Sequence, residues 1–121
     1  MDGYKSLKAW QHASRLSLTT LEAVDRHWSP RAKVVFDQLS RAVVSADINI
    51  VEGYALGTTA LYRKHVRIAL GSAAEADRLI RIARMRGYLP EPVVRRLSSV
   101  AEDTTRTLYG LVRSSNLSAR P

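Results

Sequence analysis

The chain has 121 residues, of which 45% are hydrophobic and 25% are charged. These values are typical of a soluble globular chain that forms one domain, here residues 1–121. It contains no cysteine, which excludes disulfides, thiolate catalysis and cysteine-ligated metals. The sequence shows neither a signal peptide nor an apolar run of about 20 residues that could span a membrane. We therefore expect a cytoplasmic protein without a membrane partner.

Charge is the most informative part of the composition. Nineteen Lys and Arg residues oppose eleven Asp and Glu residues, which gives a formal net charge of +8. Most of the basic residues are arginines, whose planar guanidinium suits phosphate groups and stacks on bases. One interpretation is codon bias combined with a solubilising surface. The other is a polyanionic partner, with RNA or DNA foremost.

Four helical segments are predicted in chain order, at about residues 5–27, 31–56, 59–87 and 91–113. Ser6 is a candidate N-cap for the first. The sequence "WSPR" interrupts the chain before the second, Gly57-Thr58-Thr59 ends the second and caps the third, and "RGYLPEP" stops the third. The tail, residues 114–121, is predicted to be frayed. No segment alternates with period two, so we predict an all-α, up-down-up-down antiparallel four-helix bundle.

The third segment carries both the clearest core pattern and the clearest charge pattern. Seven of its positions recur in a 4-3-4-3-4-3 rhythm, which is typical of a bundle helix: Tyr62, Val66, Ala69, Ala73, Ala76, Ile80 and Ala83. On a helical wheel at about 100° per residue, five arginines share one outward arc that extends over about 30 Å. They are Arg63, Arg67, Arg78, Arg81 and Arg84.

This arginine stripe has two interpretations. A solvated helix face is the ordinary one. However, residues 63–86 hold seven basic and two acidic side chains, whereas a purely solubilising face normally mixes the two signs. The stripe therefore also predicts contacts with the phosphate backbone of RNA or DNA.

Catalytic and metal-binding patterns are sparse. No Glu is followed by His three residues later, the three histidines are scattered, and the six glycines form no phosphate-binding loop. We therefore expect no metal, no cofactor and no small-molecule substrate. Glu52 is the best candidate for a general base, but a buried Glu paired with Arg is more often structural. A non-enzymatic protein is the prediction.

A polar stripe crosses the otherwise apolar second segment. Gln38, Arg41, Ser45, Asn49 and Glu52 occupy an arc of about 80° at the margin of the apolar face. Polar groups in such a position must satisfy one another, a facing helix or another subunit. In the third segment, Gly71 lies mid-helix, where glycine costs about 1 kcal/mol relative to alanine. A close approach by a helix of the same chain or of a neighbour would compensate for that cost.

Three motifs carry a resemblance to a known family. They are "QLSRAVVSADINIVEGY" at 38–54, "IALGSAAEA" at 68–76 and "RGYL" at 86–89, preceded by "YKSLKAWQHA" at the start. With these the chain resembles the four-helix bundle proteins encoded in intervening sequences of bacterial 23S rRNA genes (the S23 type). Those proteins are in turn similar to the accessory variability determinant of diversity-generating retroelements. The motif residues are Gln38, Arg41, Ala42, Ser45, Asn49, Ile50, Glu52, Gly53, Gly71, Ser72 and Glu75.

The resemblance implies a small, non-catalytic bundle that assembles with itself as a homopentamer. The accessory-protein relatives are positively charged and bind nucleic acid and a reverse transcriptase. The chain also departs from the family pattern. Asp47 stands where the family often has Pro, and Ala55-Leu56 stands where it often has Gly-Arg. The aromatic-Leu pair that usually precedes "IALGS" is absent, with His65-Val66-Arg67 in its place.

Three functions compete at this stage. The first is a non-catalytic, oligomeric protein that binds nucleic acid through the five arginines. The second is a protein-interaction or assembly module, of the kind that serves a reverse transcriptase, without a direct nucleic-acid role. The third is an enzyme centred on Glu52, which requires Glu52 to open onto a pocket.

Overall fold

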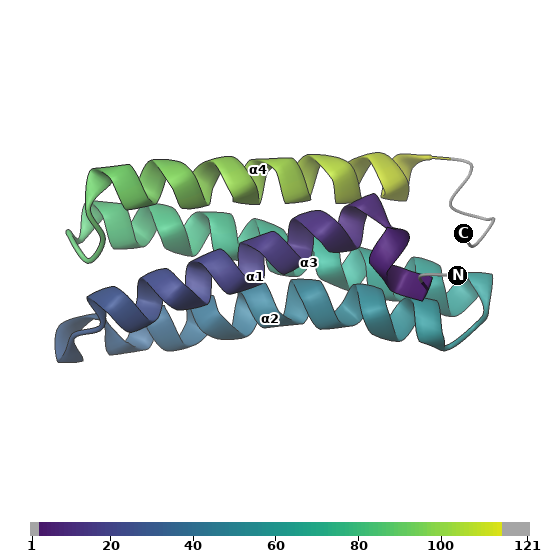
Figure 1. Cartoon of the computed structure of the whole chain (residues 1–121), viewed down its shortest axis with the longest axis horizontal. Coiled ribbons are helices and arrows are strands. Elements are labelled where there is room, and N and C mark those ends of the chain that lie inside the picture. The colour runs from purple at the N-terminus through teal and green to yellow at the C-terminus, as the bar shows by residue number, and fades with distance from the viewer. Residues whose placement is uncertain (1–2, 115–121) are drawn as a thin grey trace.

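The computed structural model describes residues 3–114 of the chain. Within that range every regular element is helical. There are four α-helices, α1 (Lys8–His27), α2 (Lys33–Ala55), α3 (Thr59–Met85) and α4 (Glu91–Arg113), and two 3₁₀ turns, η1 (Gly3–Ser6) and η2 (Pro30–Ala32). Figure 1 shows the four helices lying side by side. The α1–α2 and α3–α4 connections lie at one end of the molecule, and the α2–α3 connection lies at the other. The predicted all-α fold with four helices is confirmed.

Two helices begin later than predicted because short 3₁₀ turns precede them. The first helix was expected from about residue 5, but α1 begins at Lys8. The backbone of Leu7 is extended, with ψ 124°, and the Ser6 hydroxyl donates back to the carbonyl of Gly3 at 3.0 Å instead of capping the helix. The prediction of Ser6 as the N-cap was therefore wrong. Likewise, Pro30 begins η2 and not the second helix, and α2 starts at Lys33.

The turn between α2 and α3 follows the predicted chemistry. Gly57 has a positive φ of 83°, a conformation that favours glycine. Thr58 then caps α3, because its Oγ1 accepts a hydrogen bond from the backbone N–H of Leu61 at 3.2 Å. The predicted tail reaches only Ser114 within the described range, and residues 115–121 lie outside it.

The core is built around α3. All seven positions of its predicted rhythm are buried, and four of them are alanines, whose small side chains allow neighbouring helices to approach closely. Phe36, Leu39 and Ile50 of α2 and Leu97 and Leu108 of α4 fill the space around them, each fully buried. This packing fixes which faces of α2, α3 and α4 remain available at the surface.

Gly53 marks the closest approach of α2 to α3. A Cβ atom added at Gly53 would lie 2.7 Å from the Cβ of His65 and 3.3 Å from the Cα of Tyr62. The first distance is shorter than Cβ contacts in proteins, between atoms that are fixed to their helices, and the second is unusually tight. Gly71, in contrast, has no heavy atom within 4 Å of an added Cβ among residues 3–114. The close approach expected at Gly71 is thus not made by another helix in this range, and Gly53 makes one instead.

We expect Gly53→Ala to lower the free energy of unfolding by about 1–2 kcal/mol, because overpacking at the α2–α3 contact outweighs the gain in helix propensity. Gly110→Ala is the matched control, since an added Cβ at this helical position of α4 meets no atom of residues 3–114 within 4 Å. It should raise stability by about 0.5–1 kcal/mol. Urea unfolding followed by far-UV circular dichroism measures both values. Equal stabilisation by the two substitutions would contradict the close approach at Gly53.

Candidate functional site

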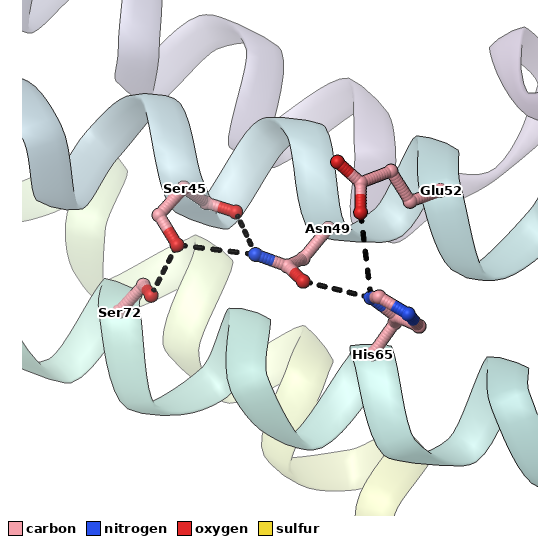
Figure 2. Close-up of polar contacts among 5 residues, drawn as sticks. All are labelled: Ser45, Asn49, Glu52, His65 and Ser72. Atoms are coloured by element: carbon pink, nitrogen blue, oxygen red, sulfur yellow. Dashed lines mark hydrogen bonds and ion pairs between the residues drawn. The ribbon is translucent and has the colours of Figure 1, made fainter.

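The polar stripe of α2 forms a hydrogen-bond chain to α3. Asn49 Nδ2 donates to the Ser45 carbonyl at 2.9 Å and to Ser45 Oγ at 3.1 Å. Ser45 Oγ also lies 2.8 Å from Ser72 Oγ, and Asn49 Oδ1 lies 2.8 Å from His65 Nδ1. Figure 2 shows these side chains pointing toward one another across the space between the two helices. Ser45, Asn49 and Ser72 therefore face their own bundle.

The directions of these bonds determine what the chain of residues can do. Because Asn49 uses its amide nitrogen on Ser45, its oxygen accepts, and His65 must carry a proton on Nδ1 to donate to it. Asn49 thus lies between His65 and Ser45, so the imidazole does not contact the Ser45 hydroxyl and cannot act on it as a base. An activated serine requires such a contact. The geometry suits the joining of two helices.

Two residues of the stripe lie outside this chain of buried contacts. The Glu52 side chain is 55% exposed, and it lies beside the imidazole of His65, with 3.9 Å between Oε2 and Nδ1. The interpretation of Glu52 as a buried carboxylate paired with Arg was therefore wrong, because Glu52 is rotated by about 100° around the helix from its neighbour Gly53, which faces α3. Arg41 is also exposed and lines a shallow hollow on the outer face of α2.

The remaining motif residues continue the α2–α3 contact toward the other end of the helices. Gln38 Nε2 donates to Glu75 Oε2 at 3.3 Å, and both side chains are exposed. Gly53 supplies the close approach described above. Six of the eleven motif residues thus lie along one helix–helix contact, namely Gln38, Ser45, Asn49, Gly53, Ser72 and Glu75.

A second polar link, between α1 and α2, was missed by the sequence analysis. Asp47 Oδ1 accepts a hydrogen bond from Trp10 Nε1 at 2.8 Å, and Asp47 Oδ2 accepts one from Ser17 Oγ at 2.8 Å. Both bonds are partly buried. The signal was present in the sequence, since an Asp stands on an apolar helix where the family often has Pro. The identity of its partners depends on how α1 docks, which the sequence of one helix does not specify.

The five predicted arginines are all exposed on α3, but they differ in their partners. Arg81 Nε donates to Asp77 Oδ2 at 3.2 Å, and Arg84 Nε donates to Glu91 Oε2 at 3.1 Å. Within residues 3–114, no ion pair involves Arg63, Arg67 or Arg78. These three guanidinium groups are therefore free to meet an external anion.

A groove follows the boundary between α3 and α4, beside the arginine stripe. One part of this groove, which we call its middle, is a hollow of 390 Å³. It is lined by Ala74, Asp77, Glu102, Thr105, Arg106 and Tyr109. An adjoining hollow of 380 Å³ shares Glu102 and is otherwise lined by Arg81, Arg84, Glu91, Val94, Arg95, Ser98 and Ser99. We call the two together the α3–α4 groove. The α4 side of this groove was not predicted from the sequence, because the register between two helices determines which residues face each other.

Two other kinds of feature are absent from the described part of the chain, residues 3–114. No group of three or more His, Asp and Glu side chains there is arranged to hold a metal ion. None of its helices combines the length and the apolar character that crossing a membrane requires.

The sequence was compared with known proteins. The model of a family described as 23S rRNA-intervening sequence protein matches residues 5–110. No curated protein matches the chain.

Proposed function

Because the chain belongs to the 23S rRNA-intervening sequence protein family, we propose that it is a small, non-catalytic helical protein that binds the backbone of RNA or DNA through the arginine face of α3. The observation that carries the proposal is the set of three exposed arginines without ion pairs among residues 3–114, namely Arg63, Arg67 and Arg78. The formal net charge of +8 supports the same partner.

The distribution of charge favours binding over solubilisation. Arg81 and Arg84 are partly neutralised by Asp77 and Glu91, and such exposed pairs contribute little to stability. A phosphate group can therefore compete for these arginines at small cost, while the three unpaired arginines offer their full charge. The non-catalytic part of the proposal is supported by the α2–α3 network, in which an amide separates His65 from the hydroxyl of Ser45.

Binding of a labelled single-stranded oligonucleotide at two salt concentrations tests this function. If three to five phosphates are neutralised, affinity should fall roughly 10- to 200-fold between about 50 mM and 200 mM salt. Filter binding or fluorescence anisotropy measures the two dissociation constants. Absence of binding at the lower salt concentration, or an affinity that salt does not change, would refute the proposal.

The second candidate function is assembly, and a specific surface favours it. Val44 and Ile48 of α2 are 40% and 45% exposed, and Ile68 of α3 is 41% exposed. A shallow hollow of 450 Å³ lies over Val44 and Ile48 and is bordered by Arg41. Exposed apolar side chains of this kind mark sites where protein partners bind. We propose that the chain forms an up-down-up-down antiparallel bundle. Through this α2 face it would assemble with other copies of itself as a homopentamer.

Sedimentation equilibrium tests the assembly. A mass near five times that of the 13.5 kDa chain is expected, and Ile48→Glu should shift it toward the monomer, because a charge would be buried at the contact. A wild-type protein that sediments as a monomer at micromolar concentration would contradict self-assembly. That result would not contradict the proposed binding of RNA or DNA by the arginine face of α3.

A further inference from the structure

The middle of the α3–α4 groove combines an exposed aromatic ring with unpaired hydrogen-bonding oxygens. Tyr109 is 52% exposed, and the Arg113 guanidinium lies 5.6 Å from the centre of its ring. Asp77 Oδ1 and Thr105 Oγ1 are both buried, and neither has a hydrogen-bond partner among residues 3–114. Both residues line the hollow beside Tyr109. Unpaired buried oxygens are uncommon, and at a surface hollow they indicate a missing donor.

The charges in this hollow select the kind of group that fits. Asp77 and Glu102 bring two carboxylates to it, and carboxylates repel a phosphate but accept hydrogen bonds from N–H groups. The hydroxyl of Thr105 can accept as well. A planar group with N–H donors on its edge and a π face for Tyr109 meets all of these requirements. Adenine, cytosine and guanine, which carry an exocyclic amino group, are such groups.

The surroundings of the hollow suit the rest of a nucleotide. Arg78 lies one helical turn from Ala74, which lines the hollow, and Arg106 lines it directly. The adjoining hollow contributes Arg81, Arg84 and Arg95 with two serines. Although Glu91 also lines the adjoining hollow, its three arginines and Arg106 would lie near the phosphates of a nucleotide whose base occupies the hollow beside Tyr109.

We propose that the middle of the α3–α4 groove is a nucleobase pocket for single-stranded RNA or DNA. An amino-bearing base stacks on Tyr109 and donates hydrogen bonds to Asp77 Oδ1 and Thr105 Oγ1. This inference rests on the proposed nucleic-acid function and narrows its partner to an unpaired strand, because the edge and face of a base inside a duplex are not available to such a pocket.

The test uses the full-length protein and a single-stranded oligonucleotide that contains 2-aminopurine, a fluorescent base with an exocyclic amino group. Wild-type protein should quench its fluorescence on binding, because the base stacks on the tyrosine ring. Tyr109→Ala should abolish the quenching and weaken binding roughly 5- to 100-fold. Tyr109→Phe keeps the ring and should retain both. A cytosine oligonucleotide should bind more tightly than a uracil oligonucleotide of the same length.

The control is Trp28→Ala, which removes an aromatic side chain of similar exposure, 50%, from the α1–α2 connection; it should leave binding unchanged. If Tyr109→Ala binds and quenches like the wild type, or if duplex binds as tightly as single strand, the base pocket is refuted while salt-dependent backbone binding stands. If the wild type binds no oligonucleotide at low salt, the proposed function itself fails.

Discussion

Replacing Arg63, Arg67 and Arg78 together by glutamine is expected to weaken binding of a single-stranded oligonucleotide about 100-fold at 0.1 M salt, or about 2.8 kcal/mol. The reason is counterion release. Each guanidinium that neutralises a phosphate of a single strand contributes a slope of about −0.7 to the dependence of log affinity on log salt. Loss of three such contacts should make that slope shallower by about 2.

A second triple variant separates local contacts from overall charge. Lys8, Arg15 and Arg26 are exposed on α1, and their replacement by glutamine lowers the formal net charge of +8 by the same three units. This variant should lose only a small part of the affinity and keep the wild-type salt slope, since long-range steering is screened beyond about 10 Å at 0.1 M salt. Equal losses in the two variants would mean that binding follows net charge and that the α3 face is not a site.

Replacing Asp47 by alanine is expected to lower the free energy of unfolding by about 2–3 kcal/mol. Asp47 accepts from Trp10 Nε1 and from Ser17 Oγ, each at 2.8 Å, and hydrogen bonds to a charged group are worth about 1.5–3 kcal/mol. The Ser17 hydroxyl retains a second acceptor, the carbonyl of Ser14 at 3.0 Å. The indole N–H of Trp10 loses the one acceptor that it has among residues 3–114 and accounts for most of the effect.

Two further substitutions calibrate this prediction. Asp47→Asn keeps one carbonyl oxygen and should cost less than Asp47→Ala. Asp37→Ala removes a carboxylate from the same helix that pairs with Lys33 at the surface, and it should cost at most about 0.5 kcal/mol. All variants are compared by urea unfolding at one protein concentration, because self-assembly would couple stability to concentration. A loss below 1 kcal/mol for Asp47→Ala would show that Asp47 does not secure α1 against α2.

The sequence predicted features that depend on one helix and missed features that depend on two. The spacing of small and apolar residues in α3 correctly identified seven buried positions, because a single helix wheel determines which face is apolar. The same wheel placed Ser45 and Asn49 at the margin of the buried face, but it could not name His65 and Ser72 as their partners. Those pairings depend on the register between α2 and α3.

The candidate site shows the same division. The arginine stripe could be read from α3 alone, and the five residues are exposed on that helix. The sequence of α3 alone does not show which of these arginines form ion pairs, because Glu91, the partner of Arg84, lies at the start of α4. The contribution of Tyr109 and Thr105 to the groove likewise required the packing of α4 on α3.

The polar stripe of α2 is therefore best understood as scaffold, and the arginine face of α3 with the α3–α4 groove as the candidate nucleic-acid site. Photocross-linking tests this division most directly. A single-stranded oligonucleotide carrying 5-iodocytosine is irradiated with the wild-type protein, and mass spectrometry identifies the modified peptides. We predict cross-links in α3 and α4, centred on Tyr109, and none over Ser40–Asn49 of α2. Cross-links confined to α1 and α2 would contradict the account.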